Sequence, residues 1–292
     1  MKTVYVDNNA TTAIAPEVLE VMQPYLTTDY FNPSSMYETA KTSARAIRQA
    51  RETIARCLGG VDPEQILFTG SATESNNAAL FGTVQANPQR RHIITSSVEH
   101  PSVLEVCKEL RQRGMDVDFL PVNRQGELSM EGYVKMLRSN TLLVSIMMAN
   151  NETGVCYPIK KLARIANETS KGVVVHSDAT QAIGKLPVDL HGSLKGVDLF
   201  SFSGHKLHAP KGVGALYLRR GTRCRPLMIG GHQESGRRAG TENVAFIVGL
   251  AKALEIADKE HEESDKRIRA LRDRLERGIL EPVSYTHLRA HE

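Results

Sequence analysis

The chain has 292 residues, 37 of them basic and 33 acidic, which gives a formal net charge of +4 at pH 7. With 41% hydrophobic and 24% charged residues it has the composition of a globular protein, long enough for one large domain or two moderate ones. The charge is nearly balanced and no segment is dominated by Lys or Arg, so nucleic-acid binding is not indicated. No apolar run is long enough to span a membrane, and no secretory apolar stretch follows Met1.

The four cysteines are far apart in the sequence and form neither a C-x-x-C pair nor a zinc-ligand pattern. A disulfide framework is therefore not expected, and reduced thiols are typical of the cytoplasm. We expect a cytoplasmic protein without a bound metal. The cysteines are Cys57, Cys107, Cys156 and Cys224.

The first 60 residues or so contain a polar turn and two helical patterns. Asn8, Asn9, Thr11 and Thr12 make the turn. A helix is predicted over residues 16–26, with Pro16 at its start, where a missing N–H does no harm. A longer helix is predicted over residues 35–58.

From residue 65 onward, short apolar runs alternate with amphipathic segments. The runs are about four to six residues long and rich in Val, Ile and Leu, which favours strands over buried helices. Such alternation predicts an α/β fold with a mainly parallel sheet that helices cover on both faces. Strands are predicted at 65–69, 92–96, 117–122, 142–147, 173–176, 198–202 and 215–219, and helices at 71–85, 102–113, 130–138 and 159–169.

The C-terminal part is predicted to be one long helix and a tail. Apolar residues recur at helical spacing over residues 241–277, and the charge run at 258–266 is interpreted as the solvated face of that helix. Residues 282–292 continue no pattern. We interpret them as a non-native tail derived from a vector or adapter, with an ordinary C-terminal coil as the alternative.

Polar residues follow several of the predicted strands at the point where each strand ends. In a parallel α/β sheet, ligands bind beyond these carboxyl ends. After the first strand, Gly70 precedes a capping box from Ser71 to Glu74, whose free backbone N–H groups could hold an anion, although most such boxes only cap a helix. His100 and the pair Asn150 and Asn151 also follow strands, and each could belong either to a turn or to a site.

Asp178 and Lys206 are the most informative of these residues. An Asp at the end of a buried strand is costly without a partner, which could be a helix start or a protonated heterocyclic nitrogen. Lys206 follows a buried strand behind Ser203, Gly204 and His205, and a lysine that forms an imine needs surroundings that lower its pKa. An acidic partner for a pyridinium, an imine-forming lysine and a phosphate cradle together are the protein's contribution to pyridoxal phosphate (PLP) chemistry.

At this point the chain resembles the cysteine desulfurases, and the NifS/IscS type within the class V aminotransferases fits best. Several motifs carry the resemblance in matching order and spacing, over about residues 1–281. They lie at residues 7–12, 32–35, 73–76, 98–100, 150–154, 178–181, 203–206 and 237–243.

The resemblance implies the aspartate-aminotransferase-like fold, known as PLP fold type I. A large domain would carry PLP on a seven-stranded, mostly parallel sheet, with a small domain built from both ends of the chain. Residues 1–14 would then be the N-terminal segment of the small domain and 15–260 the large domain. Residues 261–281 would begin a truncated C-terminal small domain, followed by the tail at 282–292.

The resemblance also implies roles for single residues. Lys206 would bond PLP, Asp178 would pair with the pyridine nitrogen, and His100 would lie against the ring as a catalytic proton shuttle. Gln181 would bind the phenolic oxygen, with Asn151 beside the ring. The cofactor's phosphate would be held by the helix start and the lysine loop, with one residue reaching across from a second subunit of a homodimer. Those phosphate-side residues are Ala72, Thr73, Ser203, Gly204, His205 and, from the second subunit, Thr241.

One part of the family pattern is not matched. The family's persulfide-forming cysteine lies on a loop more than a hundred residues beyond the lysine, and the arginine for the substrate carboxylate also lies in that part. Only Cys224 follows Lys206, and it matches no catalytic motif. We therefore expect a C-terminally truncated desulfurase that is itself inactive.

The function implied by the resemblance is removal of sulfur from L-cysteine, giving L-alanine and a persulfide for iron–sulfur cluster assembly. A scaffold or other acceptor protein would take the sulfur, in housekeeping assembly or in nitrogen fixation. Alternatives are a selenocysteine lyase, another class V enzyme such as a small-substrate aminotransferase, or a non-catalytic PLP-binding dimerisation fragment. The stretch 230–241 favours the desulfurase, and a nucleotide-binding Rossmann protein fits poorly because no G-x-G-x-x-G follows the first strand.

Overall fold

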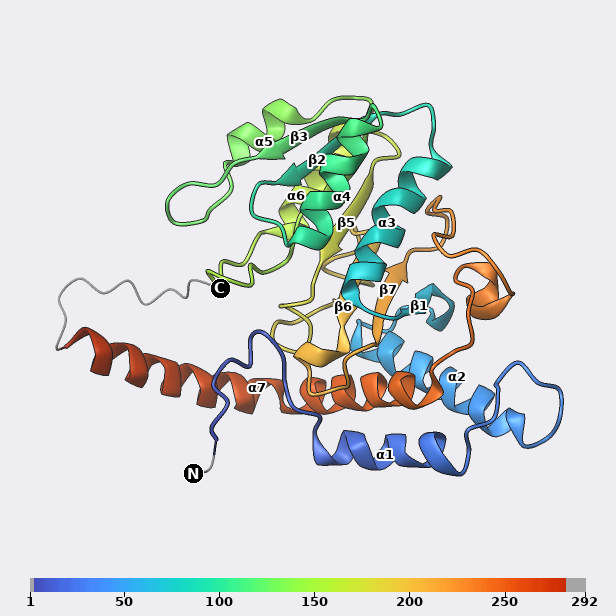
Figure 1. The fold of residues 1–292 in the computed structure, drawn as a ribbon. Helices are drawn as coiled ribbons and strands as arrows, with labels where there is room; N and C mark the ends of the chain where they lie inside the picture. The colour runs from blue at the N-terminus through green and yellow to red at the C-terminus, as the bar shows by residue number, and fades with distance from the viewer. Residues whose placement is uncertain (1–2, 282–292) are drawn as a thin grey trace.

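A seven-stranded sheet forms the centre of residues 3–281, the part of the chain that the computed structural model describes (Figure 1). The strand order is β1-β7-β6-β5-β4-β2-β3, and β7 alone runs antiparallel to its neighbours. The predicted α/β class and mostly parallel sheet are confirmed. The strands are β1 Ile66–Thr69, β2 His92–Ser96, β3 Asp116–Leu120, β4 Thr141–Ser145, β5 Val174–Asp178, β6 Leu199–Ser203 and β7 Gly214–Leu218.

Each predicted helix is present, with its ends shifted by a few residues. The largest shift is at the second helix, which begins at Ala40 rather than at residue 35, because residues 33–39 form turns. The α-helices are α1 Pro16–Thr27, α2 Ala40–Cys57, α3 Ala72–Ala86, α4 Pro101–Gln112, α5 Met130–Met136, α6 Ile159–Thr169 and α7 Val244–Leu280. Short 3₁₀ segments lie at Pro63–Gln65, Gly204–Lys206 and Gln233–Gly236.

Helices cover both faces of the sheet because successive strand residues point to opposite sides. One apolar core packs against α3 and α4, which lie side by side, and the other packs against α2, α6 and α7 (Figure 1). The first core includes Leu67, Ile93, Leu199 and Leu216. The second includes Ile66, Phe68, Val175, Phe200 and Tyr217.

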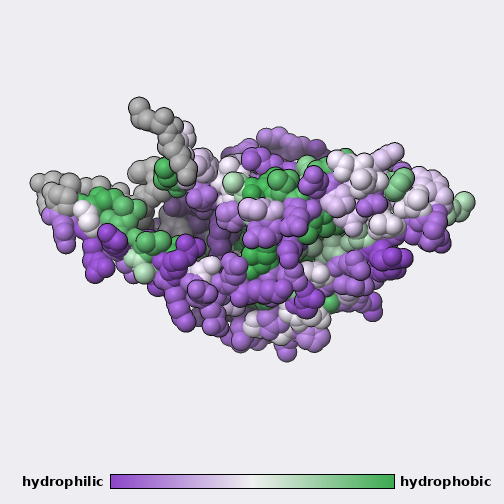
Figure 2. All heavy atoms as spheres, turned by 90° about the horizontal axis from the view of Figure 1, so that it is seen from below, coloured by the Kyte–Doolittle hydropathy of each residue, from purple (hydrophilic) through white to green (hydrophobic). Residues whose placement is uncertain are grey.

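The long helix α7 has a buried half and an exposed half. Its beginning, up to Leu254, is buried and packs on α1 and α2. Its far end extends away from the sheet and exposes Ile268, Leu271 and Leu275 (Figure 1). Figure 2 shows such hydrophobic residues among the charged ones of this arm. No helix among residues 3–281 is both long and apolar enough to cross a membrane.

A buried ion pair fixes the segment before α7 to the edge of the sheet. Arg51 of α2 makes two hydrogen bonds to Glu234, at 2.5 and 2.8 Å, and Glu234 also accepts from the backbone N–H of Phe68 at 2.9 Å. The side chains of Arg51 and Glu234 are only 13% and 2% exposed. Glu234 and Ser235 both have positive φ, a conformation that non-glycine residues hold only when their surroundings impose it.

Removal of this carboxylate is expected to destabilise the fold. Glu234→Ala leaves the Arg51 guanidinium buried without its partner, which costs on the order of 3–5 kcal/mol. The free energy of unfolding, measured in denaturant, tests this. Asp116→Ala is the matched control, because it breaks an exposed pair with Arg138 whose loss costs about 1 kcal/mol or less. Equal losses for the two variants would contradict the expectation.

Candidate active site

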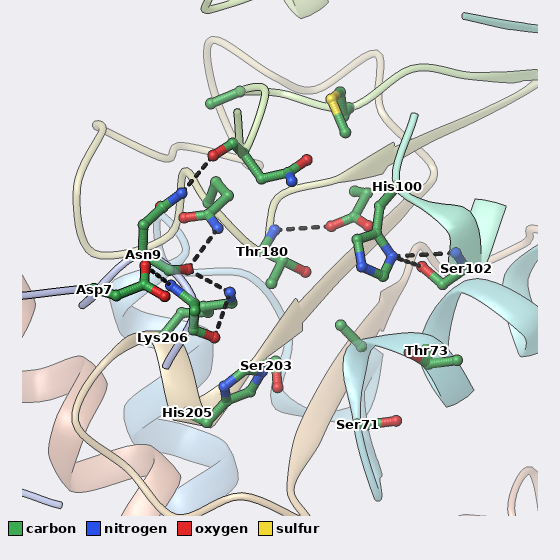
Figure 3. A pocket seen from close by; sticks show the side chains of 17 residues that line it. Asp7, Asn9, Ser71, Thr73, His100, Ser102, Thr180, Ser203, His205 and Lys206 are labelled. Atoms are coloured by element: carbon green, nitrogen blue, oxygen red, sulfur yellow. Dashed lines mark hydrogen bonds between the residues drawn. The ribbon is translucent and has the colours of Figure 1, made fainter. Parts of the chain in front are cut away.

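A cavity of about 400 Å³ lies at the carboxyl ends of the central strands (Figure 3). Most predicted site residues line it: Ala72, Thr73, His100, Asn151, Asp178, Gln181, Ser203, His205 and Lys206. Gly204 is buried between Ser203 and His205. Thr241 does not line the cavity; it lines a separate pocket with Phe68 and Gly70.

The amine of Lys206 is held by the N-terminal segment. Lys206 lies in the short 3₁₀ turn after β6, and its Nζ donates to the carbonyl oxygens of Asn9 and Ala10, the second at 2.8 Å. Burial lowers the pKa of Lys206, and the charges of Asp7 and Asp178 oppose that shift. The direction agrees with the sequence-based expectation for an imine-forming lysine, since a lower pKa makes the neutral amine available nearer to neutral pH.

Asp178 ends β5 with its carboxylate buried at the cavity wall. Its side chain accepts from Asn76 Nδ2 at 2.7 Å and from the backbone N–H of Thr180 at 2.9 Å, and the residue is 5% exposed. Among the described residues, no Lys, Arg or His makes an ion pair with it. A buried carboxylate so placed favours a cation in the cavity, such as a protonated ring nitrogen.

The start of α3 forms a second, anion-binding wall. Ser71 caps the helix by accepting from the N–H of Glu74 at 3.1 Å, while Glu74 turns back to Gly70 N at 2.7 Å and pairs with Arg238. Of the two hydrogen bonds of the predicted capping box, the one from Glu74 N–H to Ser71 forms, whereas the Glu74 side chain accepts from Gly70 instead of from the N–H of Ser71. The backbone N–H groups of Ala72 and Thr73 have no hydrogen-bond partner among the described residues and open into the cavity. Free N–H groups at a helix start are a binding site for phosphate.

Close approach by β7 keeps this helix start in place. A Cβ at Gly214 would lie 2.7 Å from the carbonyl carbon of Ser71 and 3.0 Å from the nitrogen of Ala72. Only glycine fits at this contact. The glycine at position 214 therefore allows β7 to pack directly against the first turn of α3.

His100 is the N-cap of α4. Its Nδ1 accepts from the backbone N–H of Ser102 at 3.1 Å and lies 2.8 Å from the Ser102 hydroxyl. The other ring nitrogen lies on the side away from Ser102 (Figure 3). A histidine that is fixed by a helix cap and also lines the cavity can contact a bound ring.

The N-terminal turn closes the cavity on its remaining side. Asn9 donates to the carbonyl of Asn151 and accepts from Gln181 Nε2 at 3.2 Å, so one loop residue contacts both of these predicted ligands (Figure 3). Sequence reasoning missed Asp7, Asn9 and Ala10 as lining residues, together with Ser71, Ser102, Met147, Ala149 and Thr180. The signal for the first group was the polar turn at Asn8 and Asn9, which lies within the family motif at residues 7–12.

These observations fit PLP. A buried carboxylate without a cation, a lysine with a lowered pKa and a helix start with free N–H groups line one cavity, and they match the ring nitrogen, the aldehyde and the phosphate of that cofactor. Among residues 3–281, no group of three or more His, Cys, Asp and Glu side chains could hold a metal ion. Fold and site thus define a PLP-binding α/β protein.

The chain belongs to the Aminotransferase class-V family, whose model it matches over residues 4–291, and PLP is the cofactor of that family. A cysteine desulfurase of Trichormus azollae is 50% identical over 283 residues, 97% of this chain and 70% of that protein. The cysteine desulfurase NifS of Azotobacter vinelandii is 47% identical over 285 residues, 98% of this chain and 70% of that protein. A solved NifS-like protein is 43% identical, with a TM-score of 0.93 over 96% of this chain and 76% of that chain. These findings confirm the resemblance, and the chain spans about 70% of the length of the two desulfurases.

Lys206 is expected to be the one lysine that bonds PLP. The rival is Lys185, an exposed residue that donates to Gln181 at 2.8 Å; partial desolvation of its ammonium group and the charge on Lys206 lower its pKa to about 8. Lys185 does not line the cavity. Borohydride reduction followed by peptide mapping should therefore place the cofactor on Lys206. Lys206→Ala should abolish the adduct and Lys185→Ala should keep it, whereas a retained adduct in Lys206→Ala would overturn the assignment.

A second buried acid beside the site should make stability depend on pH. Glu99 is 4% exposed, and burial, opposed in part by hydrogen bonds from Ser96 and Met147, raises its pKa from 4.5 to about 8. Between these two values the folded protein holds a proton that the unfolded chain releases. The contribution of Glu99 to the free energy of unfolding is therefore largest below about pH 4.5, and it is lost as the pH rises to about 8.

Glu99→Gln is expected to flatten that decline, because glutamine resembles the protonated carboxyl. The free energy of unfolding should be measured by denaturant at about pH 5 and about pH 8.5. The exposed Glu131→Gln is the control and should keep the wild-type slope. If Glu99→Gln lost as much stability between the two pH values as the wild type, the proton would belong to another group.

Proposed function

We propose that this protein is a PLP-dependent cysteine desulfurase, which converts L-cysteine into L-alanine and transfers the sulfur as a persulfide. The observation that carries the proposal is the single cavity that brings together Lys206, Asp178 and the free start of α3. Both relatives described above are named cysteine desulfurases. The sequence matches theirs over nearly the whole chain and the fold matches that of a NifS-like protein, which supports the same substrate for this cavity.

Bound PLP would supply an electron sink for the negative charge that develops at the substrate's Cα. Asp178 would hold a proton on the ring nitrogen and so keep that sink effective. Lys206, with its lowered pKa, would take the Cα proton and return it. The N–H groups of Ala72 and Thr73, with Ser203 and His205 opposite, would bind the phosphate and orient the ring.

Sulfur removal also needs a thiolate, and none of the four cysteines lines the cavity. Burial raises the pKa of Cys57 and Cys224 to about 11 and of Cys107 to about 12, which keeps these thiols protonated at neutral pH. Cys156 is exposed beyond the Asn151 turn and donates to the carbonyl of Gly154. We infer that the attacking thiolate is not one of these four cysteines.

The wider assignment is also a proposal. A homodimer would let Thr241, which does not line the cavity of its own subunit, contact the phosphate of the second subunit. Residues 1–14 and 261–281 would belong to a small domain and residues 15–260 to the PLP domain, which agrees with the exposed apolar residues of α7. The predicted tail at 282–292 lies outside the described residues. We also propose a cytoplasmic role in iron–sulfur cluster assembly, with an acceptor protein for the sulfur; the similarity to a desulfurase named NifS supports a link to nitrogen fixation.

The second candidate is a PLP-binding subunit that does not complete the reaction. The observation in its favour is the same absence of a cysteine from the cavity lining. A selenocysteine lyase is a further possibility within the family, and relative rates with L-cysteine and L-selenocysteine distinguish it.

The 292-residue chain is expected to exchange the Cα proton of L-cysteine without sustained release of sulfide. Proton exchange needs PLP and Lys206, whereas sulfur removal needs a thiolate that the cavity lacks. With PLP in D₂O, NMR should show loss of the Cα proton, and sulfide and alanine should remain far below repeated turnover. Lys206→Ala should stop the exchange.

The outcomes separate the candidates. Catalytic sulfide release that disappears in Cys156→Ser or Cys224→Ser would show that one of these thiols reaches the substrate. PLP binding without exchange would favour the non-catalytic subunit. Asp178→Asn should fold and slow the exchange by at least tenfold, because the ring nitrogen loses its acidic partner; an unchanged rate would contradict its proposed role.

A further inference from the structure

A chain of hydrogen bonds connects Asp178 to His100 through two side chains that the sequence motifs did not assign. Asn76 Nδ2 lies 2.7 Å from Asp178 Oδ2 and 2.8 Å from Ser102 Oγ. Ser102 Oγ in turn lies 2.8 Å from His100 Nδ1. Asn76 is fully buried and Ser102 is 8% exposed, so the two hydrogen bonds of the Asn76 amide are shielded from water. These hydrogen bonds join β5, α3 and α4 beside the cavity.

The carboxylate of Asp178 fixes the orientation of the Asn76 amide. An ionised carboxylate only accepts hydrogen bonds, so the group that faces it must be the NH₂ rather than the carbonyl oxygen. The same NH₂ has a second hydrogen, which points at Ser102 Oγ. Asn76 Oδ1 has no hydrogen-bond partner among the described residues. The orientation of the amide is therefore determined by the hydrogen bonds of its NH₂ group.

This orientation determines the direction of the next bond. Because Ser102 Oγ accepts from Asn76, its single hydrogen is free to be donated to His100 Nδ1. The backbone N–H of Ser102 also donates to that nitrogen, at 3.1 Å. Two independent donors therefore point at Nδ1, which leaves the ring proton on Nε2.

We propose that Asn76 and Ser102 are positioning residues that hold His100 as the Nε2–H tautomer, with that N–H available to a molecule in the cavity. Protonation of Nδ1 would require the Ser102 hydroxyl to turn away and the helix cap to break. His100 then acts as a fixed hydrogen-bond donor, as a neutral imidazole at a helix N-terminus can, and not as a proton shuttle. Proton transfer at the substrate's Cα remains with Lys206, a consequence that rests on the proposed function.

The tautomer can be measured directly by ¹⁵N NMR of the imidazole rings in the full 292-residue chain, with and without PLP. The chain has ten histidines, and loss of one signal set in His100→Gln assigns the ring. Protonated Nε2 and unprotonated Nδ1 are expected in both states. A proton on Nδ1 would overturn the proposal.

Variants test the two positioning residues. Ser102→Ala removes one of the two donors, so the Nδ1–H tautomer should become about fivefold more populated, the effect of one net hydrogen bond. Ser102→Thr should restore the wild-type signals, and Asn76→Leu should move them in the same direction as Ser102→Ala. Ser43→Ala and Asn77→Ala, a buried serine and the neighbouring asparagine, should leave them unchanged. Unchanged His100 signals in both Ser102→Ala and Asn76→Leu would refute the network.

Exchange kinetics test the consequence for chemistry. His100→Gln keeps an N–H donor but cannot take up a proton, so it should retain a substantial part of the Cα exchange that Lys206→Ala abolishes. Equal loss in the two variants would show that His100 transfers the proton and would overturn this assignment. If the wild type shows no exchange, the proposed function fails, and the NMR result still decides the tautomer.

Discussion

The burial of one carboxylate at the end of β5 is the constraint on which the site depends. Asp178 ends a strand of the parallel sheet, and its carboxylate is buried without making an ion pair to any Lys, Arg or His among the described residues. Two hydrogen bonds compensate part of that cost, and a cation in the cavity would compensate the rest. The charge also influences its surroundings, since it opposes the lowered pKa of Lys206 and raises that of Glu99.

Contacts between distant parts of the chain convert this strand end into a closed site. The N-terminal turn reaches Lys206, Gln181 and the Asn151 loop through the backbone and side chain of a single residue, Asn9. Burial of the Lys206 amine therefore depends on a segment almost two hundred residues earlier in the chain. The small residue Gly214 has a comparable effect on the opposite wall, because it allows β7 to touch the first turn of α3.

Much of the fold could be predicted from sequence, because strand period, helix period and the polar residues at strand ends are local signals. Asp178 and Lys206 were found in this way, since each follows a buried strand. Asp7 and Asn9 lie in the family motif at residues 7–12, but their contact with the cavity was not predicted, because it arises only when the N-terminal turn folds over the cavity. Asn76 and Ser102 were hidden for another reason: on a helix they look like ordinary polar residues, and only the distances to Asp178 and His100 reveal their directions. The position of Thr241 outside the cavity likewise depends on the tertiary structure and could not be predicted from the local sequence.

The same physics separates cofactor chemistry from sulfur chemistry in this chain. Burial disfavours the charged form of each group. It therefore lowers the pKa of a lysine and favours its neutral, reactive amine, but it raises the pKa of a cysteine and disfavours the reactive thiolate. Burial raises the pKa of Cys57, Cys107 and Cys224 in this way, and none of the three lines the cavity. A thiolate that attacks the substrate needs the opposite setting, exposed and able to approach and leave. Such a group belongs on a movable segment rather than in the sheet core, so the rigid cavity can be complete for PLP while the sulfur acceptor is supplied separately.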